Sequence, residues 1–485
     1  MGKKLDDIAR KNLDTRMTDA EFVVSEIKRF RSSKKYKDML TGVHYYDGNQ
    51  DILKKKRTAI GESQEIIEVK NLPNNKIIDN QYAKMVDQKT NYFIGQPFVI
   101  KAKNKEFEKA LRPYILSKKF FRLLKSLAED SLNCGISWLF PCYNKLGELV
   151  FKAFKPWEII PEWSDEEHTE LDAFIRIFEV VAFEGKEEKT LTKVEVYSPN
   201  GIDYFELQGE KLIAEAPYHQ SYFSLSYSDG TQQEFNWNRI PLIPFRYNKK
   251  ENPLINRCKS LQDGLNEIIS RWQDQLDEDP RNSIMVLVNY DGTNLGEFRR
   301  NLATYGVVKV QSQDGIQGDV KLLKLEINAD NYEKVIALFR REIIDNCRGY
   351  DLKDIRSGGQ PNEINIKSVY VDIELDANGM ETEYQASFEE LIWFITCHLE
   401  NTGAGSFENE EYEIIFNRDM LINESAAIDD CRKSVGIISN ETIIANHPWV
   451  DDPQAEIDKI KKEREAEEDL YSGTFQETAD KEETE

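Results

Sequence analysis

Apolar residues recur at steps of three and four in three segments near the start of the chain, a spacing typical of amphipathic helices. The first segment covers 18–46, where Thr18 is suited to cap the helix. The second segment ends at Gly95 and Pro97, after placing five apolar residues on one face: Ile78, Tyr82, Met85, Val86 and Tyr92. The third covers 118–133. We therefore expect the chain to open with three helices.

Between 136 and about 247 the period changes. Segments such as ISWLFPCY, GELVFKAF and LDAFIRIFEVV are rich in β-branched and aromatic residues, and turn-forming residues separate them. This composition predicts a run of largely antiparallel strands. Helices followed by such a run indicate an α+β domain of about 250 residues.

The helical period returns over 257–278 and again over 329–348. Pro280 ends the first of these helices. Their apolar stripes are broad, and the residues expected to pack are Leu261, Leu265, Ile268, Ile269, Trp272, Tyr332, Val335 and Phe339. Two such helices bury their stripes well against each other and against neighbouring subunits in a closed ring, although an ordinary intramolecular helical hairpin is the simpler alternative.

A short α/β insert separates these two helices. Its pattern predicts strands at IMVLVNY, GVVKVQS and DVKLLKL, and a helix near 295–304. A sheet of such short strands is not stable alone, so we expect it to pair across subunits. The apolar strand residues that would make this assembly surface are Val286, Val288, Val308 and Val310.

Beyond the second helix, YDLKDIRSGGQPNE predicts a flexible loop. Apolar residues from Val369 to Leu399 then recur at steps of three and four, which predicts one long helix with Gly379 as a candidate kink. A strand at YEIIFNRD and helices near 423–436 and 440–446 follow. The final segment is acidic and poor in apolar residues, a composition typical of disorder.

Charge and composition narrow the function. The chain of 485 residues has a formal net charge of −23, which opposes tight, sequence-independent binding to DNA phosphates. Six scattered cysteines without C-x-x-C spacing indicate buried thiols in a cytosolic protein. Neither a signal peptide nor a stretch of about 18 apolar residues is present, so we expect no membrane segment.

Motifs for catalysis are also missing from the sequence. It has no G-x-x-x-x-G-K-[ST] loop, no H-E-x-x-H helix and no G-x-S-x-G elbow. The pairs Asp429–Asp430 and Asp451–Asp452 could in principle hold Mg²⁺, but adjacent helix residues do not face each other. We expect a non-enzyme without metal or cofactor; the alternatives are a carboxylate-dependent, metal-dependent DNA-processing enzyme and a structural adaptor that merely oligomerises.

The order of these elements resembles the portal proteins of long-tailed phages that infect Gram-positive bacteria. Three blocks carry the likeness: YYDGNQDIL with NKIIDNQYAKMVDQKTNYFIGQPF, then IPLIPFRYNKKENPLINRCKSLQDGLNEIISRWQDQLDE, and finally VGIISNETIIANHPWVDDPQAEIDKIKKERE. RSGGQPNEINIK departs from the family pattern, which leaves the boundaries of the neighbouring loop open.

The resemblance implies a portal-type α+β architecture with an α/β wing, a helical stem, a small α/β clip, a long kinked helix and a helical crown. Its expected segments are a wing at 1–256, stem helices at 257–279 and 329–349, a clip at 280–328, a tunnel loop at 350–363, a long wing helix at 364–400, and a C-terminal wing and crown with an acidic tail at 401–485.

The resemblance further implies a dodecamer at one capsid vertex of the virion, assembled in the host cytoplasm. Its expected partners are the terminase motor, head-completion or adaptor proteins, scaffold, the major capsid protein, and double-stranded DNA in the channel. Such rings serve capsid assembly, DNA packaging, head–tail connection and DNA ejection.

Within the expected tunnel loop, four residues are candidates for contact with moving DNA: Lys353, Arg356, Gly358 and Gly359. A glycine pair gives mobility, and two cations in an acidic chain can make brief phosphate contacts. The alternative is a solvated connector in which these cations balance Asp351 and Asp354.

Overall fold

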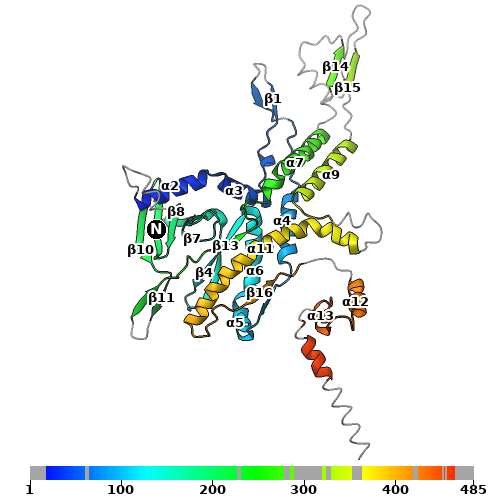
Figure 1. Ribbon diagram of the computed structural model, residues 1–485. Coiled ribbons are helices and arrows are strands. Elements are labelled where there is room, and N and C mark those ends of the chain that lie inside the picture. Colours follow the sequence, from blue (N-terminus) through cyan, green and yellow to red (C-terminus); the bar gives the residue numbers. More distant parts are fainter. Residues whose placement is uncertain are drawn as a thin grey trace, which may run out of the picture. The chain divides into compact units, whose positions relative to one another are not determined.

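The computed structural model describes residues 18–60, 65–70, 72–226, 231–277, 284–288, 319–323, 329–351, 363–418, 424–450, 453 and 456–464. The chain forms two compact units. The first comprises Met1–Asp351 and Tyr370–Asp419, and the second comprises Leu352–Val369 and Met420–Glu485. Helices and sheets are mixed in the first unit, as the sequence predicted (Figure 1).

The predicted helix over 18–46 is in fact two helices, α2 (Asp19–Ser32) and α3 (Lys34–Tyr46). Ser33 separates them with an extended backbone, at φ −66° and ψ 154°. Its hydroxyl accepts a hydrogen bond from the Tyr36 amide, while its own amide donates to the Phe30 carbonyl. A serine that caps one helix while ending another competes with the continuous helical ladder, which is why the single-helix prediction was wrong.

The next helices are α4 (Gln81–Ile94), α5 (Lys105–Ile115) and α6 (Lys118–Cys134). Tyr82, Met85, Val86 and Tyr92 are buried on α4, as predicted. Ile78 does not belong to that face, because Asn80 caps the helix and residues before it are not helical. Helix α5 was not predicted. The short helix η1 (Asp51–Lys54) and the hairpin of β1 (Thr58–Ile60) and β2 (Ile66–Glu68) precede α4.

The predicted strand region forms antiparallel sheets. Its elements are β4 (Ile136–Tyr143), β5 (Leu149–Phe154), the short helix η2 (Pro156–Glu158), β6 (Ile159–Trp163), β7 (Leu171–Glu184), β8 (Glu187–Ser198), β9 (Gly201–Gln208), β10 (Lys211–Gln220), β11 (Phe223–Ser226), β12 (Gln232–Phe235) and β13 (Ile243–Arg246). A five-stranded sheet has the order β10-β9-β8-β7-β6, and a three-stranded sheet has the order β13-β4-β5. Val23 and Ile27 of α2 pack on the larger sheet.

Two long helices follow the sheets, α7 (Ile255–Asp277) and α9 (Ala329–Asn346). Between them, β14 (Ile284–Val288) pairs antiparallel with β15 (Asp319–Leu323), which confirms two of the three strands predicted there. The expected helix near 295–304 and the expected strand GVVKVQS lie outside the described residues.

The long helix predicted after the loop is α11 (Glu363–Asn401), and Gly379 lies within it. The strand that follows, β16 (Tyr412–Ile415), pairs with β3 (Val99–Ala102), so the end of the first unit returns to its beginning. In the second unit, α12 (Glu424–Lys433) and α13 (Asn440–Ala445) match the helices expected there. No helix among the described residues is long and apolar enough to span a membrane.

Candidate functional site

Helices α7 and α9 lie side by side (Figure 1) and contact each other through aromatic side chains. Trp272 stacks on Tyr332, and the Tyr332 hydroxyl donates to Gln275 Oε1 at 2.9 Å. Nearer the start of α7, Gly264 faces Phe339: a Cβ atom at position 264 would lie 3.1 Å from the ring. The intramolecular pairing expected from the sequence therefore forms.

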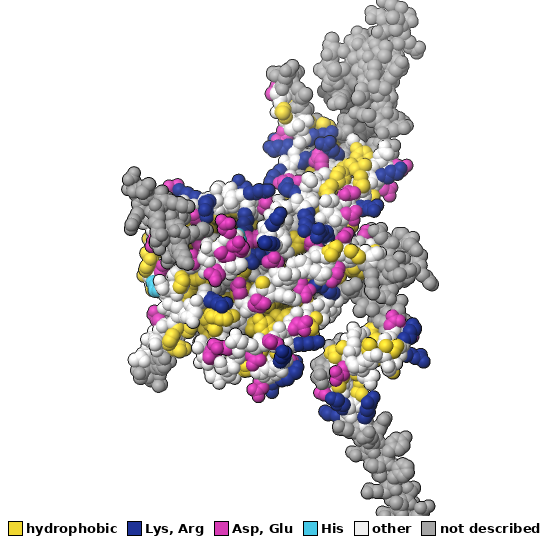
Figure 2. Space-filling view, viewed as in Figure 1, with side chains coloured by type: hydrophobic (Ala, Val, Ile, Leu, Met, Phe, Trp, Pro, Cys, Tyr) yellow, Lys and Arg dark blue, Asp and Glu magenta, His cyan; other side chains and the backbone are white. Residues whose placement is uncertain are grey.

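This pairing covers the predicted stripe only in part. Of the eight predicted packing residues, Leu265 is fully buried, whereas seven are half-buried: Leu261, Ile268, Ile269, Trp272, Tyr332, Val335 and Phe339. Leu276 and Leu338 are exposed, Leu338 to 55%. Figure 2 shows apolar side chains gathered on one face of this helix pair. An uncovered apolar surface of this kind is typical of an assembly interface.

The opposite face of α7 is polar and buried, a feature that the sequence analysis missed. Four side chains at steps of four residues accept hydrogen bonds from backbone amides of the segment 75–82. The pairs are Asp274 with Asn75 at 2.6 Å, Ser270 with Ile77 at 2.9 Å, Asn266 with Asp79 at 3.0 Å, and Gln262 with Tyr82 at 3.1 Å. We call these four pairs the polar ladder.

The ladder satisfies amides that have no strand partner. Residues 72–80 belong to no helix or strand, and buried amides without hydrogen bonds would cost about 1 to 3 kcal/mol each. Lys55 adds an ion pair to Asp274 at 2.7 Å. Both ends of the β1–β2 hairpin are therefore fixed to the end of α7.

A buried ion cluster lies where α7 begins and α9 ends. The carboxylate of Asp376, on α11, accepts from Lys89 Nζ of α4 at 2.8 Å, from the Tyr247 hydroxyl at 2.6 Å and from the Arg257 guanidinium at 3.0 Å. Arg348 lies 3.6 Å away. Burial alone would raise the pKa of Asp376, but Lys89 and its other partners outweigh burial and lower the pKa. One carboxylate thus ties α4, α7 and α11 to the turn that follows α9.

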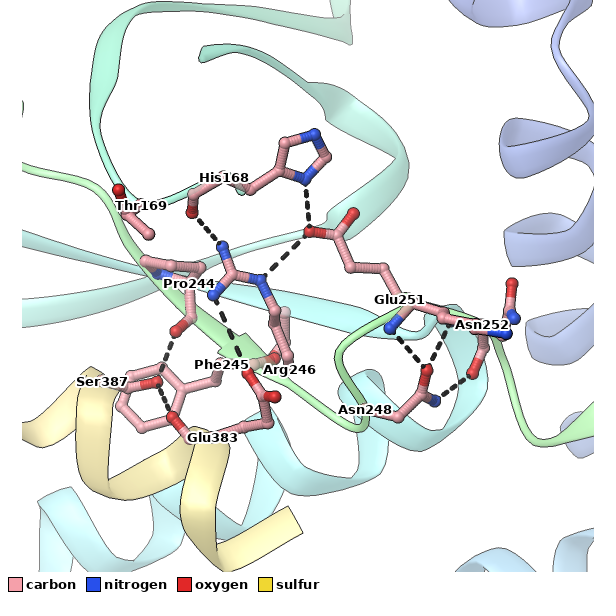
Figure 3. Close-up of polar contacts among 12 residues, drawn as sticks. His168, Thr169, Pro244, Phe245, Arg246, Asn248, Glu251, Asn252, Glu383 and Ser387 are labelled. Carbon is pink, nitrogen blue, oxygen red and sulfur yellow. Dashed lines mark hydrogen bonds and ion pairs between the residues drawn. The ribbon is translucent and has the colours of Figure 1, made fainter. Parts of the chain in front are cut away.

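A second cluster holds the chain between β13 and α7 (Figure 3). Glu251 is buried and contacts Arg246 Nε at 3.1 Å, His168 Nδ1 at 3.1 Å and Lys35. Burial would raise the pKa of Glu251, yet the charge of Lys35 and the other contacts lower it to about 2.

Gly135 makes room for this cluster. Its φ is +84°, and a Cβ atom there would lie 2.0 Å from the Glu251 carbonyl oxygen. Ser387 of α11 joins the same region by donating to the Pro244 carbonyl at 2.5 Å.

Cysteines follow the expectation in part. Cys134, Cys258 and Cys347 are buried, whereas Cys142, Cys397 and Cys431 are half-buried, and all six are free thiols. No group of three or more His, Cys, Asp or Glu residues in the described part of the chain could hold a metal ion.

Several predicted site residues are not placed by the structure. Lys353, Arg356, Gly358 and Gly359 lie outside the described residues, as do Val308 and Val310. Val286 and Val288 lie in β14, where they pair with Lys321 and Asp319 of β15. The pairing seen here is within one chain, and pairing across subunits stays a prediction.

Comparison with known proteins places these features in a family. The family model for phage portal proteins of the SPP1 Gp6-like type matches residues 27–470. The portal protein of Bacillus phage SPP1 is 27% identical over 428 residues, covering 88% of this chain and 83% of the relative. The portal protein of Clostridium phage phiCD119 is 26% identical over 427 residues, covering 86% of this chain and 90% of the relative.

Solved structures give a weaker likeness. The neck of the native GTA particle, computed with C12 symmetry, matches with a TM-score of 0.41 and 12% identity, covering 76% of this chain and 89% of that one. The neck of the empty GTA particle, computed with C6 symmetry, matches with a TM-score of 0.40 and 13% identity, covering 75% of this chain and 88% of that one.

The family match extends over most of the chain, and the chain therefore belongs to the SPP1 Gp6-like phage portal proteins. It is a component of the phage virion at the capsid vertex.

Proposed function

We propose that twelve copies of this chain form a closed ring around a DNA channel, with α7 and α9 as the stem. The half-covered apolar face of the α7–α9 pair carries this proposal. Such a face is costly in water and is buried when identical neighbours repeat around a ring. The family resemblance supports the number twelve.

The proposed division of the chain follows the same resemblance. Residues 1–256 form the wing, 280–328 the clip, 350–363 the tunnel loop and 364–400 the long wing helix, while 401–485 complete the wing and crown. The clip, with β14 and β15, would dock the terminase motor during packaging and head-completion proteins afterwards. Scaffold and the major capsid protein would contact the ring during assembly in the host cytoplasm.

Charge supports a channel along which DNA slides. Twelve copies at −23 each carry a formal charge of −276, so most of the wall repels a phosphate backbone. Brief contacts would come from Lys353 and Arg356 of the tunnel loop, with mobility from Gly358 and Gly359.

Native mass spectrometry of the purified chain tests the ring. A mass near twelve subunits supports the proposal. A monomer that nicks DNA with added Mg²⁺ indicates a nuclease instead, and a small oligomer indicates an adaptor. Filter binding adds a second measurement, because nanomolar affinity for free duplex DNA at 0.15 M salt contradicts a sliding channel.

The loop contacts need a separate experiment. Lys353→Ala with Arg356→Ala should leave the ring intact but slow packaging or weaken retention of packaged DNA. Lys118→Ala with Lys119→Ala, on the exposed side of α6, is the matched control. Normal packaging and retention by the loop variant would remove the proposed DNA contact.

A further inference from the structure

The β1–β2 hairpin is a small sheet that exposes large apolar side chains. Three residue pairs join its strands, Thr58 with Glu68, Ala59 with Ile67, and Ile60 with Ile66. Ile66 is 79% exposed and Ile67 is 45% exposed. A two-stranded hairpin is marginally stable in water, and open strand edges invite pairing with another chain. Ile66 and Ile67 therefore lack full cover from the part of this unit that the structure describes.

The base of the hairpin is firmly held. Lys55 and Asn75 both bind Asp274 on α7, and Arg57 donates to the Pro73 carbonyl at 2.9 Å across the two arms of the hairpin. Asn75 also donates to Asp277 at 2.8 Å, in the last turn of α7. Such an anchor presents Ile66 and Ile67 in a defined place, so little ordering entropy opposes their binding.

The hairpin and α9 lie on opposite flanks of α7. Successive helix residues are rotated by about 100°, so Ser270 and Trp272, two positions apart, point in nearly opposite directions. Ser270 belongs to the polar ladder that leads to the hairpin, whereas Trp272 stacks on α9. Gln262 and Gly264 repeat the same relationship two turns earlier. Helix α7 is thus the middle of three adjacent elements (Figure 1).

We propose that the hairpin of one copy packs on the exposed surface of α9 around Leu338 in the next copy. This inference rests on the proposed ring. In a cyclic assembly, one flank of each subunit meets the other flank of its neighbour. The hairpin exposes Ile66 and Ile67, and α9 exposes Leu338, which lies about 100° around the helix from Phe339, the residue that faces α7. Each surface covers the other without a third protein.

Charge favours a second copy as the occupant. Residues 54–70 hold five Lys or Arg against three Glu, whereas the whole chain has a formal net charge of −23. Helix α9, the proposed contact, holds four Asp or Glu against three Lys or Arg, so its net charge is opposite in sign to that of the hairpin segment.

Crosslinking tests the contact directly. In a background with Cys142, Cys397 and Cys431 changed to Ser, Ile67→Cys is combined with Leu338→Cys and treated with a short bis-maleimide. We expect a ladder of covalent multimers up to the full ring. Mixed rings from chains carrying one cysteine each should give dimers and nothing larger.

Phe183→Cys with Leu338→Cys is the matched control, since Phe183 is an exposed residue at the end of β7, in another part of the same unit. Equal crosslinking of this pair overturns the proposal. An intact twelve-subunit mass without crosslinks between positions 67 and 338 also overturns the proposal. In that case the proposed ring is still supported. A wild-type chain that forms no ring removes the proposed function together with this contact.

A substitution gives an independent measurement. Ile67→Asp should raise the protein concentration needed for half-assembly by at least roughly ten-fold, because a buried isoleucine is replaced by a charge. Leu146→Asp, in the exposed turn between β4 and β5, should leave assembly unchanged. Equal effects of the two substitutions contradict a specific role of the hairpin.

Discussion

Trp272 of α7 and Tyr332 of α9 stack with ring centroids 5.6 Å apart and planes 8° apart. Both side chains are half-buried, so the stack is covered on one side only. It couples the two helices within a chain while leaving apolar surface for a neighbour.

Trp272→Ala should weaken the ring more than the fold. We expect the free energy of assembly to become less favourable by about 2 kcal/mol per chain, because packing is reduced. Far-UV circular dichroism should be unchanged. Native mass spectrometry should show fewer complete rings. Trp449→Ala, an exposed tryptophan of the second unit, is the control and should assemble normally. Full assembly of the Trp272 variant would contradict a stem role for the stack.

Asp376→Asn should destabilise the first unit strongly. The substitution leaves Lys89 and Arg257 near each other without their shared carboxylate, and breaking a buried ion pair typically costs about 3 to 5 kcal/mol. Urea unfolding measures the change. Asp372→Asn, one turn earlier on the exposed side of α11, should have little effect. Similar unfolding midpoints for the two variants would argue against the cluster as a tie point.

Asn266→Leu should loosen the polar ladder. The Asp79 amide would lose its acceptor, and we expect a cost of about 1 to 3 kcal/mol. Hydrogen exchange of the peptide covering 72–80 should become faster. Arg271→Gln, on an exposed position of the same helix, serves as the control. Unchanged hydrogen exchange of 72–80 in the Asn266→Leu variant would contradict the role of the polar ladder in holding this segment.

Glu251 should make the first unit sensitive to acid. Its pKa is about 2 in the folded chain against an ordinary value of 4.5, so its contribution is complete above about pH 4.5 and is lost as the pH falls toward 2. The contribution is about 3 kcal/mol. Between pH 5 and pH 2, wild-type stability should therefore fall by about that much more than the stability of Glu251→Gln. Parallel pH profiles of the two proteins would show that Glu251 titrates normally.

Periodicity predicted the apolar half of α7 but not its polar half. Leu261, Leu265 and Trp272 were identified because apolar residues at helical spacing have one economical explanation, a packed face. Gln262 and Asn266 look like a solvated face in the sequence, and their burial depends on an extended segment almost two hundred positions away. Their signal was the run of mostly uncharged polar residues at steps of four.

Local competition explains the errors near the start of the chain. Ser33 was treated as an ordinary helix position, although its side chain also suits a cap. Helix α5 was not predicted because it is short and contains Pro113. The ion clusters around Asp376 and Glu251 could not be predicted, since each gathers residues from distant elements and charged residues are abundant throughout the chain.

The polar ladder joins two segments whose rise per residue differs, helix α7 and the segment 75–79. Four helix residues advance about 6.0 Å and two extended residues about 6.7 Å, so the two spacings differ by under 1 Å at each of the two steps from Asn75 to Asp79. Side chains of different length absorb this difference. The last step covers three residues, from Asp79 to Tyr82, because Gln81 and Tyr82 already belong to α4. A single-residue insertion in 75–79 would turn every later amide to the wrong side. The ladder thus fixes the length of the segment 75–79, because an insertion there would break the pairing of its amides with α7.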